Sequence, residues 1–401
     1  MIEKRNSGVK AAAGIAAVCV FTYFVSYYIR NLLSVSTPEM LTYGFNKEFI
    51  GTLSSTYMFV YAVGQLVNGA LGDVVRPKFM ALIGLCSAGG VSIAFAFVTA
   101  PFLQILLFAL LGFSLSMLRG PLVKTMCENM KSEYAHVACV FLSVITSAGP
   151  LAASLFSIAF DWRGTFAVAG ATGVFFAAVA FVILTAFEKK EIIAYKKSGR
   201  SKKEKRSVFA LFKLHDFFYY MLVGMICEIA GTTITFWLPT YLTERLSFDE
   251  NTAGILFSSI TLINSLAPFA ALMILKLFGG RDKRMSGTVF AISAVSFLGV
   301  FFIEARWINI LLILLALASV RLSSTLLWSV YIPDQAESGL VSTLNGFLDF
   351  SGYVAATLAN LLFSFTVAFV GWGGIVLMWC ALALLGILAA LLASGKHKKI
   401  T

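Results

Sequence analysis

Runs of about 20 apolar residues recur along the whole chain, and this recurrence restricts the fold more than any other feature. A run of that length crosses the hydrocarbon core of a bilayer as one α-helix. Only 13% of the 401 residues are charged, whereas about 25% is usual in soluble domains. Inside lipid every backbone polar group needs an internal partner, which favours helices. The sequence therefore predicts an all-α integral membrane protein.

We expect twelve transmembrane helices, arranged as two six-helix bundles. Most connections between the apolar runs are short, but the basic stretch 188–215 is long and has six runs on either side. We therefore predict an N-terminal six-helix half at 1–187, a basic cytoplasmic linker at 188–215 and a C-terminal six-helix half at 216–401. The predicted spans are 11–38, 49–71, 79–99, 102–127, 136–159, 164–187, 216–243, 251–277, 285–304, 307–331, 339–368 and 372–394.

The distribution of basic residues predicts the orientation of these spans. Of the 31 Lys and Arg residues, 23 fall in the two tails, in 188–215 and in the loops on the same side, and only four fall in the opposite loops. Loops rich in Lys and Arg stay in the cytoplasm, so both termini are expected there, with the protein in the cell (inner) membrane. The net charge of +11 then reflects contact with anionic lipid, and no nucleic-acid partner is expected.

No pattern in the chain indicates an enzyme, a metal or a cofactor. The six cysteines lie within or beside apolar runs without CxxC spacing, so we expect free, buried thiols. His136, His215 and His397 are scattered over loops and a tail, which disfavours a structural metal site. P-loop, nucleophile-elbow and dinucleotide motifs are also missing from the sequence. An integral-membrane enzyme is therefore unsupported.

An internal repeat relates the two halves. Pro38 near the end of the first span matches Pro239 near the end of the seventh, at an offset of 201 residues. Arg119 in the fourth span and Arg321 in the tenth are 202 residues apart. Repeats of this kind place a substrate site where the two halves meet. We therefore expect a pseudo-two-fold relation between the bundles.

The first span carries a polar stripe. Tyr23, Tyr27, Arg30, Asn31 and Ser34 follow helical spacing, so they share one face. An arginine at membrane depth costs about 2.5 kcal/mol or more unless it faces protein or water. Its planar guanidinium matches carboxylate or phosphate groups, which favours an anion-binding site. The alternative is an arginine neutralised by a neighbouring carboxylate for packing alone.

The remaining charges within spans have several possible partners. Lys124 and Glu128 are spaced to pair with each other, and we expect Arg321 and Asp349 to pair or approach. Glu228 could gain and lose a proton, or it could be the fixed partner of a basic residue. Both interpretations of Glu228 remain open at this point.

The loop at 69–78 predicts a gating element. Gly69 and Gly72 permit close helix approach. Asp73 can cap the start of a helix or pair with Arg76 or Lys78. These features indicate a structural role in conformational change rather than substrate contact.

The pattern at 69–78, Gly-x-x-x-Asp-x-x-x-Pro-Lys, resembles the conserved loop of the major facilitator superfamily. Segments 27–40, 236–242 and 345–363 further resemble the organophosphate:phosphate antiporter branch. The resemblance implies a twelve-helix transporter fold, usually monomeric. It also implies that Arg30 corresponds to the arginine that binds substrate phosphate in that branch, and that Arg119 supports conformational coupling.

One departure from the branch concerns the seventh span. Glycerol-3-phosphate and hexose-phosphate transporters have a second arginine there, and both the resemblance and the internal repeat place that position at Gly231. Glu228 lies one turn earlier. A two-arginine clamp is therefore in doubt, and a singly charged anion fits as well as a phosphoester. Trp237 and Asn345 are further candidates for lining the site.

The sequence thus predicts a secondary transporter that binds a small organic anion at Arg30 and exposes it alternately to each side. The substrate would be a sugar phosphate, a sugar acid or a carboxylate. A proton or inorganic phosphate would be the coupling species, and no cofactor is expected. The alternative is a non-transporting membrane sensor for a phosphorylated sugar, as some relatives in this branch are.

Overall fold

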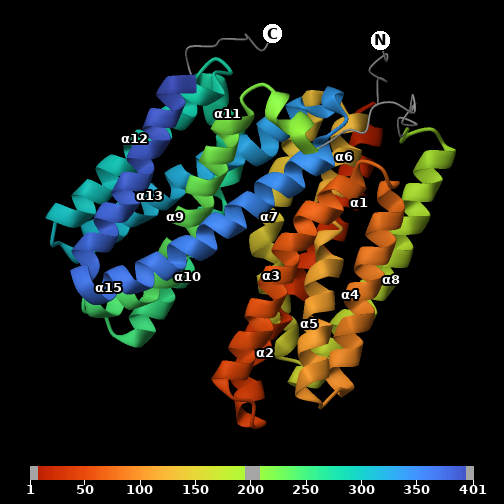
Figure 1. The fold of residues 1–401 in the computed structure, drawn as a ribbon, viewed down its shortest axis with the longest axis horizontal. Coiled ribbons are helices and arrows are strands. Elements are labelled where there is room, and N and C mark those ends of the chain that lie inside the picture. The colour runs from red at the N-terminus through yellow and green to blue at the C-terminus, as the bar shows by residue number, and fades with distance from the viewer. Residues whose placement is uncertain (1–7, 195–207, 394–401) are drawn as a thin grey trace. The chain divides into compact units, whose positions relative to one another are not determined.

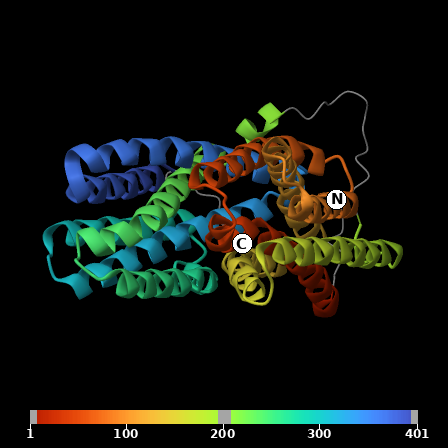
Figure 2. The ribbon, with the colours of Figure 1, turned by 90° about the horizontal axis from the view of Figure 1, so that it is seen from below.

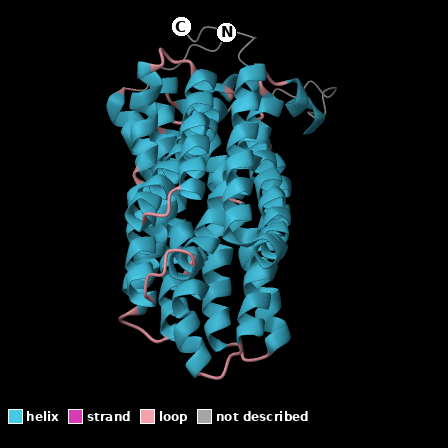
Figure 3. Ribbon diagram, turned by 90° about the vertical axis from the view of Figure 1, so that its left-hand side faces the viewer, coloured by secondary structure: helices cyan, strands magenta, loops and turns pink. Residues whose placement is uncertain are grey.

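The computed structural model describes residues 8–194 and 208–393. These residues form helices joined by loops (Figure 3), which confirms the predicted all-α class. His397, which the sequence places in a tail, lies outside the described residues. The α-helices, all but α14 labelled in Figure 1, are α1 Val9–Arg30, α2 Leu32–Thr42, α3 Lys47–Gly72, α4 Pro77–Phe97, α5 Pro101–Ser116, α6 Arg119–Asn129, α7 Ser132–Ser157, α8 Trp162–Lys189, α9 Phe217–Glu244, α10 Glu250–Ser265, α11 Ala267–Leu277, α12 Asp282–Phe302, α13 Arg306–Leu326, α14 Ile332–Asp334 and α15 Val341–Ala393.

Most of these helices have the length and the apolar composition of a membrane span. Among the described residues, nine helices are long and apolar enough to cross a bilayer. The pair α10 and α11, bent by 43°, would form a tenth as one broken span. The predicted stretch 49–71 lies within α3, and the predicted stretch 339–368 begins two residues before α15 and is otherwise helical. The count of twelve spans and the cytoplasmic position of the termini stay predictions.

Local sequence signals explain where several helices begin and end. Asn46 accepts a hydrogen bond from the amide of Phe49 at the start of α3, and Asp249 accepts one from Thr252 at the start of α10. Such caps satisfy amides that have no partner within the helix. Gly371 has a φ of 67°, which breaks α15 into two helical segments at the boundary predicted between the last two spans.

The chain divides into two compact units. The first comprises Met1–Ala210 and Ile332–Phe350, and the second comprises Leu211–Tyr331 and Ser351–Thr401. The start of α15 therefore groups with the N-terminal spans. The division predicted from the sequence, with six spans on either side of 188–215, stays a prediction. Residues 195–207 of that stretch lie outside the described residues.

In the first unit, α4 packs along α8, α3 along α5, and α1 against α7 (Figure 1). The crossing of α4 and α8 is close because of two glycines. A Cβ on Gly89 would lie 2.5 Å from the carbonyl oxygen of Gly170, and a Cβ on Gly170 would lie 2.5 Å from that of Gly89. Small residues allow helix backbones to approach in this way within membranes.

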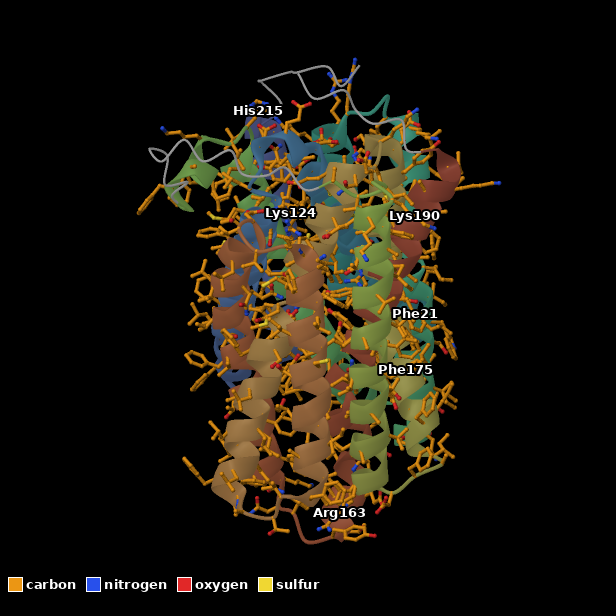
Figure 4. All side chains as sticks on the ribbon, turned by 90° about the vertical axis from the view of Figure 1, so that its right-hand side faces the viewer. Phe21, Lys124, Arg163, Phe175, Lys190 and His215 are labelled. Atoms are coloured by element: carbon orange, nitrogen blue, oxygen red, sulfur yellow. The ribbon has the colours of Figure 1, made fainter. Side chains whose placement is uncertain are left out.

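Large apolar side chains cover the outside of the first unit. Phe21 and Phe175 are 45% and 62% exposed, between the levels of Lys190 and Arg163 at the two ends of α8 (Figure 4). An apolar surface bounded by charged ends is what lipid contact requires. The chain is a multi-pass membrane protein.

In the second unit, the helices coloured green to blue lie side by side (Figure 2), with α12 and α9 both packed on α13. A buried cluster that includes Leu275, Met285 and Leu326 joins α11, α12 and α13. Ser286 and Ser323 form a buried hydrogen bond of 2.7 Å between α12 and α13. Polar contacts of this kind hold helices together where lipid supplies no hydrophobic driving force.

Candidate functional site

Arg30 is the last residue of α1, at a break in the first span. The backbone leaves regular helical geometry at Asn31, whose φ and ψ are −96° and 2°, and α2 begins one residue later. The Asn31 side-chain amide donates to the carbonyl of Tyr27 at 2.7 Å. A cation is favoured at the carbonyl end of a helix, so the break stabilises the guanidinium of Arg30 at this position.

Three tyrosine rings surround the Arg30 guanidinium. Its central carbon lies 4.6 Å from the ring centroid of Tyr61, 5.2 Å from that of Tyr27 and 5.8 Å from that of Tyr57. One guanidinium nitrogen donates to the Tyr27 hydroxyl at 3.4 Å, and the other lies 3.9 Å from the sulfur of Met58. Each cation–π contact contributes about 0.5 to 2 kcal/mol. Helices α1 and α3 thus build one aromatic cage around the charge.

Sequence reasoning found the α1 side of this cage but missed the α3 side. Tyr57 and Tyr61 are four residues apart, and their rings are stacked with centroids 5.8 Å apart. The same spacing that singled out Tyr23 and Tyr27 was present in 49–71. It was overlooked because this stretch carries no charged residue between its ends.

A buried ion pair lies in the same unit. A guanidinium nitrogen of Arg119 donates to Oδ1 of Asp349 at 2.8 Å, and their side chains are 16% and 5% exposed. The side-chain amide of Asn345 lies 3.3 Å from the other carboxylate oxygen. The sequence predicts that Arg321 and Asp349 pair or approach each other, whereas the structure pairs Asp349 with Arg119. The pairing joins α6 to α15 across 230 positions of the chain, which no local pattern could indicate.

Arg30 and Arg119 both belong to the first unit, at the end of α1 and the start of α6. Tyr27 and Tyr61 contact Arg30, and Asp349 pairs with Arg119. We call Arg30, Arg119, Asp349, Asn345, Tyr23, Tyr27, Tyr57 and Tyr61 the arginine–tyrosine cluster. It draws on α1, α3, α6 and the start of α15.

Two hydroxyls in the cluster have no hydrogen-bond partner among the described residues. Tyr23 and Tyr57 are 2% and 6% exposed, and both hydroxyl oxygens are buried without a partner. A buried polar group left without a partner costs about 1–3 kcal/mol. Tyr23 is within electrostatic range of Arg119 and Tyr57 within range of Arg30. These hydroxyls are donors available beside the two cations.

Glycines bring the start of α15 against α3 and α6. A Cβ on Gly346 would lie 2.1 Å from the carbonyl oxygen of Gln65, and a Cβ on Gly69 would lie 2.9 Å from the Cα of Gly346. Gly72 and Gly120 leave room for the Ser342 side chain in the same way. The prediction that Gly69 and Gly72 allow close helix approach is confirmed. This packing carries Asp349 to Arg119.

Asp73 caps the start of α15, which is one of the two roles that the sequence predicts for it. Its carboxylate accepts from the amides of Ser342 and Thr343 at 3.1 and 2.8 Å and from the Thr343 hydroxyl at 2.5 Å. The Lys124 ammonium lies 3.6 Å from the same carboxylate. The predicted pairing of Lys124 with Glu128 is therefore replaced by a pairing with Asp73.

The two basic residues of this loop have another partner. Lys78 and Arg76 lie 2.5 and 3.7 Å from the carboxylate of Glu188 at the end of α8. The predicted alternative, in which either residue pairs with Asp73, is not what the structure shows. The loop is instead fastened at two points, to α15 through Asp73 and to α8 through its basic residues.

The other candidate residues belong to the second unit. A Cβ added to Gly231 in α9 would meet nothing within 4 Å, so this position has open space beside it. The Glu228 side chain lies against Gly352, where an added Cβ would be 2.7 Å from its Cγ. Glu228 and Arg321 are both within electrostatic range of the Cys227 thiol. The Trp237 indole N–H is buried without a hydrogen-bond partner among the described residues.

The described residues contain no group of three or more His, Cys, Asp or Glu side chains placed to hold a metal ion. The chemistry that the arginine–tyrosine cluster supports is non-covalent. Guanidinium groups and tyrosine hydroxyls bind oxyanions through charge-assisted hydrogen bonds.

Comparison with known proteins relates the chain to transporters. Residues 19–348 match the Major Facilitator Superfamily. A phosphoglycerate transporter protein from Salmonella typhimurium is 24% identical over 390 residues, which cover 90% of this chain and 84% of that protein. A probable hexose phosphate transport protein from Chlamydia pneumoniae is 30% identical over 89 residues, covering 22% of this chain and 19% of the relative. The fold is similar to that of a bacterial homologue of the iron transporter ferroportin, with a TM-score of 0.75, 12% identity and coverage of 95% and 100% of the two chains.

Proposed function

Because this chain belongs to the Major Facilitator Superfamily, we propose that it is a secondary transporter of a small organic anion, which Arg30 binds during alternating access. The chain is a membrane transporter and not an enzyme. We place it in the cell (inner) membrane as a monomer. The substrate class we propose is a sugar phosphate, sugar acid or carboxylate, in keeping with relatives named for phosphoglycerate and hexose phosphate transport.

The observation that carries this proposal is the environment of Arg30. The side chain is half-buried, and three tyrosine rings surround the guanidinium. Tyr27 and Tyr23 line the α1 side, Asn31 fixes the end of α1, and Asn345 contacts the neighbouring carboxylate. Trp237 supplies a donor in the second unit.

We further propose that the fastened loop participates in gating. Asp73, Arg76 and Lys78 hold α15 and α8 in the arrangement described above. In transport this arrangement would open and re-form. Arg321 and Glu228 would act in coupling from the second unit, with a proton or inorganic phosphate as the coupling species. Glu228 would carry the proton if the mechanism is symport.

Uptake by purified protein in liposomes tests the role of Arg30. The variant Arg30→Gln should reduce uptake of labelled glycerol 3-phosphate or inorganic phosphate by about 30-fold or more, because a buried charge–charge contact is lost. Arg163→Gln is the matched control, since that guanidinium also lies over an aromatic ring, at 5.1 Å from Trp162, but at the end of α8 far from Arg30 in sequence. The control should transport normally.

Two outcomes would contradict the proposal. Normal uptake by a folded Arg30→Gln protein would remove Arg30 from substrate binding. Tight binding of a phosphorylated sugar by the natural protein, without any flux in liposomes, would support the alternative of a non-transporting sensor. For coupling, a Glu228→Gln variant that exchanges substrate but cannot accumulate it against a pH gradient would support symport.

A further inference from the structure

We propose that a cavity in the second unit binds the headgroup of a zwitterionic phospholipid, with Arg245 and Arg306 on its phosphate and Glu304 on its primary amine. The cavity has a volume of about 270 Å³ and lies between the loop 245–249 and the loop 303–305. It shares no residue with the arginine–tyrosine cluster, so the proposal does not depend on how the transported anion binds. The polar residues of its lining are Tyr241, Arg245, Ser247, Glu304, Arg306 and Asn309.

The cavity lies at one face of the membrane. Near the start of α12 the Lys283 ammonium donates to the carbonyl of Ala393, the last residue of α15, at 3.0 Å. At the other end of α12, Val300 and Ile303 line the cavity. An α-helix of 21 residues is about 30 Å long, which is the thickness of the hydrocarbon core. The cavity is therefore at the level of the lipid headgroups, on the side away from the end of α15.

The three charged side chains of the cavity keep most of their hydrogen-bonding groups for a ligand. Arg306 donates to the Ser247 carbonyl at 3.5 Å, which is longer than the usual range of about 2.7–3.2 Å. Among the described residues neither Arg245 nor Glu304 has an ion-pair partner, although both line the same small cavity. Guanidinium groups bind phosphate oxygens, and a carboxylate accepts from an ammonium group. The lining therefore complements a ligand that carries both a phosphate and an amine.

Arg306 stands at a place that favours a bound anion. It is the first residue of α13, and Ala305 at the N-cap makes no side-chain cap hydrogen bond. The amide end of a helix disfavours a cation such as Arg306 and attracts phosphate. A phosphate in the cavity would offset the unfavourable position of this guanidinium and would also accept from the first amides of α13.

Buried polar groups fix the walls of the cavity. Asn309 is 1% exposed, and its side-chain oxygen accepts from the Tyr241 hydroxyl at 2.9 Å. Its side-chain amide donates to the carbonyl of Ile303 and, at 3.4 Å, to that of Ala305. Asn309 thus ties α9 to the loop that carries Glu304. The carboxylate is held beside the cavity without a ligand.

The loop after α9 is fixed against α13 as well. The Phe248 ring packs edge-on against Trp307 at 5.5 Å, and the Arg306 guanidinium lies 5.7 Å from the centre of the same ring. Ser247 has a φ of 53°, in a region that residues other than glycine rarely occupy. Strained backbone of this kind occurs at ligand sites. A cavity whose walls are already ordered loses little entropy when it binds.

Exposed apolar side chains continue from the cavity along α13, and they identify the ligand as a lipid. Trp307, Leu311 and Leu315 follow one another at intervals of four residues, so they share one face of the helix, and all three are exposed. Tryptophan is enriched at the headgroup level of membrane proteins. A lipid with its headgroup in the cavity can lay its acyl chains on this stripe, whereas a water-soluble phosphodiester gains nothing from it.

Glu304 selects among lipid headgroups. A primary ammonium has three N–H donors for a carboxylate, whereas the quaternary ammonium of phosphatidylcholine has none. Phosphatidylglycerol has a phosphate but no cation, so the Glu304 carboxylate repels it. The lining therefore favours phosphatidylethanolamine over both.

Native mass spectrometry of the purified full-length protein in detergent measures the affinity for each lipid. The probes are phosphatidylethanolamine, phosphatidylcholine and phosphatidylglycerol with identical acyl chains. The natural protein should bind the first most tightly. Arg245→Gln/Arg306→Gln should weaken that binding by about 30-fold, or roughly fivefold for each basic residue. The matched control is Arg281→Gln/Arg284→Gln, at two exposed arginines by the other end of α12, and it should bind as the natural protein does.

Glu304→Gln distinguishes recognition of the amine from a structural role. It should abolish the preference for phosphatidylethanolamine over phosphatidylcholine and should tighten the binding of phosphatidylglycerol, because the repelling carboxylate is gone. A merely destabilised loop would weaken the binding of all three lipids. If Arg306→Gln releases the loop, Arg245→Gln alone keeps the test valid, with an expected loss of about fivefold.

Three results would overturn the proposal. The first is equal affinity of the natural protein for phosphatidylethanolamine and phosphatidylcholine. The second is unchanged affinity for phosphatidylethanolamine in the folded Arg245→Gln/Arg306→Gln protein. The third is binding of glycerophosphoethanolamine, which has no acyl chains, as tightly as the lipid, because the ligand would then be a water-soluble phosphodiester.

Discussion

The first span and the seventh differ sharply, although the internal repeat makes them equivalents. In the first unit the helix breaks after Arg30, and three tyrosines hold the guanidinium there. In the second unit α9 is one helix from Phe217 to Glu244, and the equivalent residue is Gly231 with open space beside it. One helix is built around a charge and the other leaves the same position empty.

This difference shows how an approximate repeat becomes an asymmetric site. The proline that follows each position is retained, as Pro38 within α2 and Pro239 within α9. The proline is therefore shared, while the charge and the helix break are not. The first unit also holds Arg119, which pairs with Asp349 at the start of α15. Under the proposed function, Arg30 of the first unit binds the anion, and Glu228 and Arg321 of the second unit act in coupling.

The largest expected effect comes from the helix contact that assembles the first unit. Gly346→Ala places a methyl group 2.1 Å from the Gln65 carbonyl oxygen, so α15 must move away from α3 and Asp349 must leave Arg119. Overpacking of this kind costs about 1–3 kcal/mol or more. We expect a lower melting temperature and loss of uptake. Thermal unfolding in detergent, followed by tryptophan fluorescence, measures the first effect.

Gly231→Ala is the matched control, since its methyl group meets no atom within 4 Å. It should be neutral or stabilise α9 by about 0.5–1 kcal/mol, because alanine loses less backbone entropy than glycine in a helix. Equal melting temperatures for the two variants would show that the close contact at Gly346 does not hold the unit together.

Adding the missing arginine would test the asymmetry directly. Gly231→Arg should tighten binding of glycerol 3-phosphate, because a hydrogen bond to a charged group contributes about 1.5–3 kcal/mol. Gly254→Arg in α10 is the control, since that position also has no atom within 4 Å of an added Cβ. Isothermal titration measures both. Unchanged affinity in a folded Gly231→Arg protein would mean that this position does not face the anion.

A smaller effect is expected when the cage around Arg30 is opened. Tyr61→Ala removes the nearest ring, at 4.6 Å, and should weaken anion binding by about 0.5–2 kcal/mol. Tyr61→Phe keeps the ring and should retain most of the affinity. Tyr43→Ala, at an exposed aromatic residue beyond α2, should change nothing. If Tyr61→Phe is as weak as Tyr61→Ala, the hydroxyl rather than the ring is the part that matters.

The smallest expected effect is on the pH dependence of stability, in which the N-terminal caps of α3 and α10 should differ. The hydrogen bond from the Thr252 amide lowers the pKa of Asp249 from its ordinary value. Because the folded-state pKa is the lower one, the cap contributes stability above the unfolded value of about 3.9 and loses it as the pH falls through the folded value. Asn46, which caps α3, does not titrate. Asp249→Asn should remove this acid sensitivity and Asn46→Asp should introduce it, as measured by melting temperature against pH; identical profiles would refute the assignment.

Local patterns predicted the helices and one side of the site. Hydropathy is set within about 20 residues, so every predicted span falls on helical structure. The stripe of Tyr23, Tyr27 and Arg30 was visible for the same reason, since its residues are neighbours on one helix. Tyr57 and Tyr61 had an equivalent signal that could have been used.

Partners distant in sequence could not be predicted. Asp73 caps a helix that begins some 270 positions later, and Asp349 pairs with Arg119 across 230 positions. Asp73 had a suitable cation only three residues away in Arg76. Asp349 had a suitable cation in Arg321, which the internal repeat relates to Arg119. Electrostatics alone does not choose among them. The choice is made by the glycines that let α15 approach α3.

The division between the units falls within α15, between Phe350 and Ser351. A helix is stiff because each backbone hydrogen bond links neighbouring turns. Asp349 and Gly352 are less than one turn apart, yet the first contacts Arg119 in one unit and the second adjoins Glu228 in the other. One stretch of helix less than a turn long thus carries both a residue that pairs with Arg119 and a residue that adjoins Glu228. Any substitution that unwinds this turn is expected to disturb both contacts at once.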